Sequence, residues 1–302
     1  MLFTNKRGGF DFAKDPAVVN FKGKYFLYFT AAVTPEEKAA GLSITVGIAV
    51  SDDMESWEYL GTLPIEQECE KNGIGAPGAV VIDGRVQLFY QTYGNGRLDA
   101  ICRAVSEDGV HFMKDASNPV YRPTADWCCG RAIDADVVLF KDQLFLYFAT
   151  RDHAFEIQKI GAAVAPAQSG FSAGDFKQLT ASAVLAPELL WENKCIEAPA
   201  TVVHDGKIYL FYGGAYNCEP QQIGCAVSSD GRTFEKLFLD QPFIPKGEEG
   251  AFNASESGHP YAFADEDGRV WLFYQGSPDR GKTWYLSRLE IGFREGKPYV
   301  IG

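Results

Sequence analysis

Five similar apolar and aromatic segments recur along the chain at nearly equal intervals. They are GKYFLYFT (23–30), GRVQLFYQ (84–91), KDQLFLYFA (141–149), GKIYLFYG (206–213) and GRVWLFYQ (268–275). Their aligned leucines, which lie 61, 58, 64 and 62 residues apart, are Leu27, Leu88, Leu146, Leu210 and Leu272. A regular period of this size over almost all of the 302 residues predicts five copies of one small structural unit.

Each segment follows one strand-like run, and in most repeats another run follows it. The runs alternate with a period of two residues, as β-strands require, and Asp-Gly pairs at 83–84, 205–206 and 267–268 mark hairpin turns. We therefore predict an all-β fold: one five-bladed β-propeller catalytic domain over residues 1–302, with four antiparallel strands per blade. Two β-sandwich domains would not repeat so evenly. Only residues 34–42 and 154–159, both in connections, have a helical pattern.

The composition limits the partners of the chain. It has 28 basic and 40 acidic residues and a formal net charge of −12, which argues against nucleic acid and against an anionic membrane surface. No apolar run is long enough for a transmembrane helix, and no secretory signal is visible, so a cytoplasmic location is expected. The cysteines are odd in number, and the adjacent Cys128 and Cys129 lack the spacing of a zinc site.

Three of the five modules carry a carboxylate where their first strand begins: Asp15, Asp134 and Glu197. The first strand of a propeller blade lines the central channel, so equivalent or nearly equivalent positions direct these side chains toward one axis. Carboxylates gathered in a low-dielectric funnel shift one another's pKa, a cost that indicates a purpose. Two carboxylates flanking a glycosidic bond are the groups that its hydrolysis needs. Aromatic rings for stacking on sugars are offered by Trp127, Trp191 and Trp284.

Four short motifs resemble those of glycoside hydrolase family 43 and its five-bladed relatives. They are Asp15-Pro16 before GKYFLYFT, Ile133-Asp134 before VVLF, Glu197-Ala198-Pro199 before ATVV, and Gly258-His259-Pro260. Residues 51–61 also resemble the outer-strand sequence of that group, and the resemblance covers essentially the whole chain. Two departures stand out: Glu-Ala-Pro replaces the usual Glu-Gly-Pro, and Ile-Asp-Ala-Asp replaces Ile-Asp-Pro.

The resemblance implies an inverting mechanism. Asp15 would be the general base that activates water, Glu197 the general acid, and Asp134 the residue that orients the acid and tunes its pKa. The resemblance places His259 near the axis, where family members hold a water or a calcium ion, so His259 is the one expected metal contact and no cofactor is required. An inverting enzyme holds its acid and base roughly 6.5–9.5 Å apart.

Further residues near these motifs are expected to contact the substrate. Strand alternation puts Asp136 on the same face as Asp134. Arg131, Arg151 and Arg288 are candidate clamps for sugar or carboxylate groups, although two of them are expected to be ordinary salt-bridge partners. The complete predicted substrate-binding set is Asp136, His259, Glu256, Trp127 and Arg288.

These features favour an exo-acting glycoside hydrolase that takes short plant-type oligosaccharides. The resemblance implies α-L-arabinofuranosides or β-D-xylosides as substrates. Related propellers that act as mannoside phosphorylases, fructosidases or anhydro-galactosidases are the alternative on the same fold. A phosphorylase would need Arg, Lys and His gathered at the funnel, and the first strands show no such cluster. A non-catalytic sugar-binding propeller would repeat the same residues in every blade, whereas these residues differ. A hydrolase-like protein that has lost its activity is a further alternative.

Overall fold

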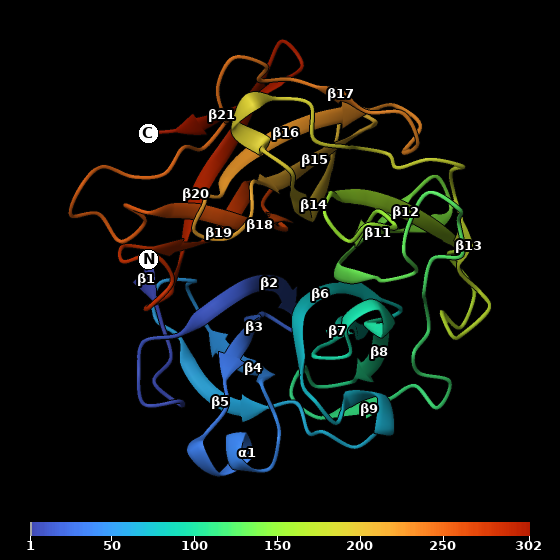
Figure 1. Ribbon diagram of the computed structural model, residues 1–302, viewed down its shortest axis with the longest axis vertical. Coiled ribbons are helices and arrows are strands. Elements are labelled where there is room, and N and C mark those ends of the chain that lie inside the picture. Colours follow the sequence, from blue (N-terminus) through green and yellow to red (C-terminus); the bar gives the residue numbers. More distant parts are fainter. Residues whose placement is uncertain (1) are drawn as a thin grey trace.

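The computed structural model describes residues 2–302, and its blades follow one another in chain order around a central axis (Figure 1). The strands of the first two blades, innermost first, are β2 (Ala13–Phe21), β3 (Lys24–Ala32), β4 (Ile44–Ser51), β5 (Glu58–Thr62), β6 (Ile74–Ile82), β7 (Arg85–Thr92), β8 (Ile101–Ser106) and β9 (Phe112–Lys114). Those of the third and fourth blades are β10 (Ile133–Phe140), β11 (Gln143–Arg151), β12 (Gln158–Pro166), β13 (Lys177–Gln178), β14 (Ile196–His204), β15 (Lys207–Gly214), β16 (Gln222–Ser228) and β17 (Glu235–Lys236). The predicted five-bladed propeller is confirmed.

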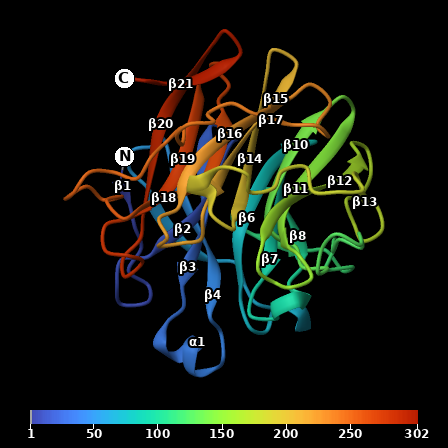
Figure 2. The ribbon, with the colours of Figure 1, turned by 45° about the horizontal axis from the view of Figure 1, so that its top comes forward.

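Both ends of the chain complete the fifth blade. Its strands are β18 (Glu256–Ala264), β19 (Val270–Ser277), β20 (Tyr285–Arg294), β1 (Leu2–Phe3) and β21 (Lys297–Ile301). The first part of β20 pairs with β1, and its second part pairs with β21, so the two termini lie on the same side of the ring (Figure 2). Pairing of the first strand with the last module closes the circle of blades without leaving an open sheet edge there.

Helices are few and short. The predicted helix over 34–42 is present as α1 (Pro35–Ala39), capped by Thr34, whose side chain accepts the Glu37 N–H. The helical interpretation of 154–159 is wrong, because Asp152 Oδ1 accepts the N–H groups of residues 156 and 157 in a turn that leads directly into β12. The remaining helical turns are η1 (Glu68–Glu70), η2 (Gly96–Leu98) and η3 (Leu190–Glu192). Within residues 2–302, no helix has the length and apolar character to span a membrane.

The repeated leucines form the centre of each blade. All five are fully buried, and burial of such a side chain contributes about 1.5–3 kcal/mol to folding. Contacts between blades also repeat: the Tyr28 hydroxyl of the first blade donates to the Gly109 carbonyl of the second at 2.9 Å. In the same way, Tyr147 of the third blade donates to Gly231 of the fourth at 2.9 Å. The sequence repeat is therefore also a repeat of packing.

The fourth and second blades each contain a buried ion pair beside their second strand. The Glu192 carboxylate accepts hydrogen bonds from Lys236 Nζ at 2.7 Å and from the Tyr212 hydroxyl at 2.6 Å. In the second blade Glu70 has the same arrangement with Lys114, at 2.5 Å. Glu192 is fully buried and the Lys236 side chain is 5% exposed, so loss of the lysine would leave a carboxylate in the interior without its cation.

We predict that Lys236→Met lowers the free energy of unfolding by about 3–5 kcal/mol, because it leaves Glu192 buried without its cation. Urea denaturation followed by circular dichroism measures the change. The matched control is Lys194→Met, because Lys194 and Glu156 form an exposed pair at 3.4 Å that is worth less than about 1 kcal/mol. Equal effects of the two substitutions would contradict the prediction.

Candidate active site

Every inner strand contains one residue with left-handed backbone close to its start. These residues, with φ values of 52°, 41°, 53°, 52° and 39°, are Asp15, Ala76, Asp134, Ala198 and His259. At each of them the pairing with the second strand shifts register, as in a β-bulge. A positive φ is uncommon for residues other than glycine, so five occurrences at equivalent positions identify a feature that is built into the repeat.

The N–H group of each left-handed residue donates to a side chain. Ala76 donates to Thr30 Oγ1 at 2.8 Å, and Asp134 donates to Gln91 Oε1 at 2.8 Å. The other three bonds have distances of 3.3, 3.0 and 3.1 Å, and they run from Ala198 to Asp134 Oδ2, from His259 to Gln221 Oε1 and from Asp15 to Gln275 Oε1. A ring of side chain to backbone bonds therefore fixes the start of all five inner strands.

Glu197 does not occupy the position equivalent to Asp15 and Asp134. It lies one residue before the left-handed Ala198 and pairs with Gly213, as Lys14 pairs with Thr30 in the first blade. The predicted near-equivalence of the three carboxylates thus holds for two of them, and the third reaches the cavity from the preceding register position.

Two glutamine amides hold the Glu197 carboxylate. Gln221 Nε2 donates to its Oε1 at 2.6 Å, and Gln158 Nε2 donates to its Oε2. The Gln158 oxygen accepts from Arg151 Nε at 2.8 Å and from Arg131 Nη1 at 3.4 Å. Because its oxygen faces two guanidinium groups, the Gln158 amide must turn its N–H toward Glu197. Sequence analysis missed both glutamines.

Asp15 and His259 form a buried pair, with 3.0 Å between His259 Nδ1 and Asp15 Oδ1. Burial alone raises the pKa of Asp15, but the His259 imidazole and the Lys14 ammonium outweigh it and hold that pKa well below its ordinary value. Burial lowers the pKa of His259, and the Asp15 carboxylate outweighs it and raises that pKa above its ordinary value. The pair therefore favours an ionised Asp15.

The pKa of Asp134 is shifted in the opposite direction, upward. Burial raises its pKa to about 7, the carboxylates of Glu197 and Asp15 add to the rise, and His259 opposes it. Its Oδ2 also accepts the N–H of Ala198 at 3.3 Å, so it fixes the backbone next to Glu197. The pKa values of two acidic groups at equivalent positions in the ring are thus shifted in opposite directions.

The predicted catalytic residues come together in one cavity of about 470 Å³, lined by Asp15, Asp134, Glu197 and His259. Its volume is in the range of small-molecule sites. Trp284 also lines the cavity, as expected for a ring that stacks on a sugar. Trp191 instead stacks on Tyr212 within the fourth blade, with ring centroids 6.1 Å apart.

Four residues that were predicted to contact the substrate do not line this cavity: Trp127, Glu256, Arg288 and Asp136. Trp127 packs near Gly161 of the third blade. Glu256 lies behind the cavity, where it accepts from Gln275 Nε2 at 3.1 Å. Arg288 stacks over Trp271 at 3.9 Å and pairs with Glu55, so it is one of the structural arginines.

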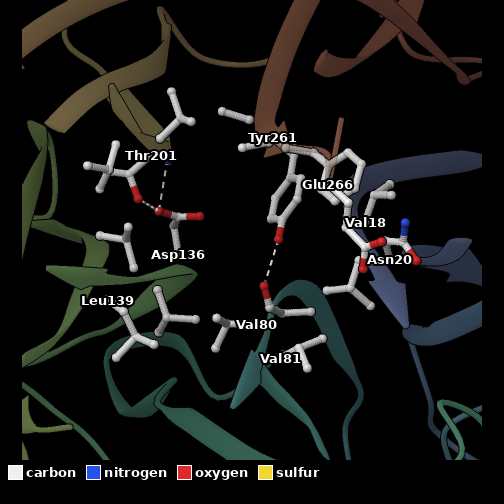
Figure 3. A pocket seen from close by; sticks show the side chains of 18 residues that line it. Val18, Asn20, Val80, Val81, Asp136, Leu139, Thr201, Tyr261 and Glu266 are labelled. Carbon is white, nitrogen blue, oxygen red and sulfur yellow. Dashed lines mark hydrogen bonds between the residues drawn. The ribbon is translucent and has the colours of Figure 1, made fainter. Parts of the chain in front are cut away.

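Asp136 lines a different cavity, of about 360 Å³, that is formed by later residues of the same five inner strands (Figure 3). Its Oδ2 accepts the N–H of Thr201 at 3.0 Å and the Thr201 hydroxyl. The expected shared face with Asp134 fails because the left-handed bulge at Asp134 breaks the alternation that the sequence argument assumed. Asp134 therefore lines the active-site cavity, and Asp136 lines the cavity at the other end of the channel.

The donor set near His259 does not by itself make a calcium site. Calcium prefers six to eight oxygen ligands, whereas residues 2–302 contain no group of three or more His, Cys, Asp or Glu side chains placed to hold a metal. Nδ1 of His259 already faces Asp15. Calcium on the axis stays a prediction, and no step below depends on it.

The cavity also gathers basic side chains from both inside and outside the first strands. Lys14, Arg131 and Arg151 line it together with His259. Arg131 lies just before β10 and Arg151 ends β11, so two of the three arginines that were candidate clamps reach the cavity from outside the first strands. The expectation that the funnel lacks a basic cluster is therefore not met.

The sequence of the chain is similar to those of known glycoside hydrolases. The sequence profile described as Glycosyl hydrolases family 43 matches residues 11–290. A β-xylosidase of Xylanibacter ruminicola is 28% identical over 96 residues, which are 32% of this chain and 25% of that protein.

Two solved structures with a similar fold cover nearly the whole chain. One, a thermostable family-43 glycoside hydrolase, has a TM-score of 0.76 at 20% identity, covering 99% of this chain and 96% of that one. The other, an α-L-arabinanase of Cellvibrio cellulosa complexed with arabinohexaose, has a TM-score of 0.73 at 16% identity, covering 96% and 95%. With the profile match over most of its length, the chain belongs to glycosyl hydrolases family 43.

Proposed function

We propose that the protein is an inverting glycoside hydrolase that removes single α-L-arabinofuranosyl or β-D-xylosyl units from short oligosaccharides. The observation that carries this proposal is the opposed setting of two carboxylates in one cavity. Asp15 is paired with the His259 imidazole, whose pKa it raises, whereas Glu197 is held by two neutral amides.

Asp15 is suited to the role of general base. Its low pKa keeps it ionised over the neutral range, so it can accept a proton from water while the water attacks the anomeric carbon. His259 and Lys14 supply the positive charge that maintains this state, and the Gln275 bond to its N–H fixes its backbone.

Glu197 is suited to the role of general acid. As it gives its proton to the leaving oxygen, its carboxylate becomes charged, and the N–H groups of Gln158 and Gln221 already point at its oxygens. Donors that are oriented before the reaction stabilise charge that develops in the transition state. Asp134 contributes by fixing the Ala198 N–H next to the acid.

The size and walls of the cavity support exo action on a pentose. It has room for few sugar units, and the similar proteins named above include a β-xylosidase and an α-L-arabinanase. The cations in the same cavity make phosphorolysis the second candidate, because phosphate could replace water as the nucleophile. A cytoplasmic site of action stays part of the proposal.

Replacement of Asp15 or Glu197 by its amide should lower kcat on the order of 10²–10⁴-fold, because each group transfers a proton in the transition state. Initial rates on an unactivated pentosyl disaccharide measure this loss, and a p-nitrophenyl pentoside, whose leaving group needs little protonation, should partly restore Glu197→Gln but not Asp15→Asn. The control is Asp136→Asn, which changes a buried aspartate of the other cavity and should leave the rate near that of the wild type. Wild-type rates in both active-site variants would refute the assignment.

The stereochemistry of the product provides a second test. Proton NMR of the first product formed from an α-L-arabinofuranoside or β-D-xyloside should show the inverted anomer, without phosphate and in the presence of a chelator. Retention of configuration would contradict the proposed roles. Sugar phosphate formed only when phosphate is added would favour phosphorolysis instead.

The Asp15–His259 pair predicts a shift in pH dependence. His259→Asn removes the cation that lowers the pKa of Asp15, so Asp15 becomes protonated at higher pH and the acidic limb of the kcat/KM profile should move to higher pH. The control is His204→Asn, because His204 stacks on Phe293 outside the cavity. An unmoved acidic limb in a folded His259→Asn variant would show that the pair does not control the base.

A further inference from the structure

Arg151 is a cation of the cavity that has no carboxylate partner. Its Nε donates to Gln158 at 2.8 Å and its Nη1 lies 3.4 Å from the Phe155 carbonyl. No ion pair of Arg151 exists among residues 2–302. Arg131 beside it is partly neutralised, because its Nε lies 3.4 Å from the buried carboxylate of Asp99. Arg151 is therefore the guanidinium of this wall that has no direct carboxylate contact.

Two aromatic rings fix the Arg151 guanidinium. Its central carbon lies 4.5 Å from the centroid of the Phe155 ring and 5.0 Å from that of Tyr216, and Tyr216 also lines the cavity. A guanidinium held on aromatic faces loses little conformational freedom when it binds. Its planar array of donors matches an oxyanion such as a carboxylate, which accepts two parallel hydrogen bonds.

The position of Arg151 relative to Glu197, the proposed general acid, indicates which part of a substrate Arg151 contacts. Arg151 bonds to the oxygen of Gln158, and the amide nitrogen of Gln158 bonds to Glu197. In the proposed reaction Glu197 protonates the leaving oxygen, so Arg151 lies on the leaving-group side. Lys14 and His259 act on Asp15 instead.

We propose that Arg151, with Arg131 beside it, forms an oxyanion subsite for the carboxylate of a uronic acid in the leaving group. This inference rests on the proposed function and narrows it: the preferred substrate is a pentosyl unit linked to an acidic sugar. Inorganic phosphate has the same oxyanion chemistry, so the test must distinguish the two sources.

The experiment compares a pentosyl-uronic acid disaccharide with its neutral methyl ester, and with a p-nitrophenyl pentoside. The wild type should cleave the acid with a kcat/KM about 10- to 100-fold above that for the ester, as expected for charge-assisted hydrogen bonds. Arg151→Gln keeps an amide donor for Gln158 but removes the charge, so kcat/KM should fall about 10- to 100-fold more for the acid than for either neutral substrate, which abolishes the preference. The preference should also weaken at high salt.

The matched control is Arg97→Gln, because Arg97 stacks on the same Phe155 ring at 4.9 Å without lining the cavity. Equal kcat/KM for acid and ester in the wild type would overturn the inference. A fall of equal size on all three substrates in Arg151→Gln would also overturn it, because Arg151 would then only position Gln158.

Binding separates this inference from the proposed function. Calorimetry with the folded Asp15→Asn variant should give tighter binding of the acid than of the ester even if no substrate is turned over, and equal binding would overturn the subsite. Phosphate should compete with the acidic disaccharide without entering the product. Phosphate that accelerates turnover and appears as a sugar phosphate would overturn the uronic acid assignment.

Discussion

One left-handed residue near the start of each inner strand determines where the functional side chains of this propeller lie. The N–H of each of these five residues is bound by a side chain, usually one from the neighbouring blade. Left-handed backbone costs on the order of 1–3 kcal/mol at a residue with a side chain, so the surrounding ring of hydrogen bonds is what maintains it. Three of the five, Asp15, Asp134 and His259, line the active-site cavity, so the residues at these positions set much of its chemistry.

The ring is symmetric in backbone but not in chemistry. Asp15 and His259 are neighbours in the ring and form an ion pair, whereas Ala76 and Ala198 carry no ionisable group. Glu197 comes from the adjacent register position and is held by amides rather than by a cation. In the proposed mechanism, Asp15 is the ionised base and Glu197 gives up a proton, which is the division of roles that inverting hydrolysis requires.

The sequence allowed much of this to be predicted, because the repeat is strict where packing demands it. The five buried leucines defined the blades, and the motifs around Asp15, Asp134, Glu197 and His259 identified residues that share one cavity. The failure at Asp136 has a clear cause: strand alternation was extended through a bulge. It therefore placed Asp136 beside Asp134, although the two lie at opposite ends of the channel.

A further feature of the sequence indicates which side chains bind the left-handed residues. The last letters of the five repeated segments are Thr30, Gln91, Ala149, Gly213 and Gln275, and the three polar ones among them bind the N–H of a left-handed residue. Where the letter is Gly213, Gln221 fills the space. Arg131 and Arg151 were candidate clamps from the sequence, but only the fold shows that both lie beside Gln158 and Glu197.

A crystal structure of the Asp15→Asn variant with a bound xylo- or arabino-oligosaccharide tests the central claim most directly. The account predicts a terminal pentose whose anomeric carbon lies between residue 15 and Glu197, with the glycosidic oxygen within hydrogen-bond distance of the Glu197 carboxyl group. A sugar bound only at the opposite mouth beside Asp136, or a glycosidic oxygen that faces away from Glu197, would contradict it.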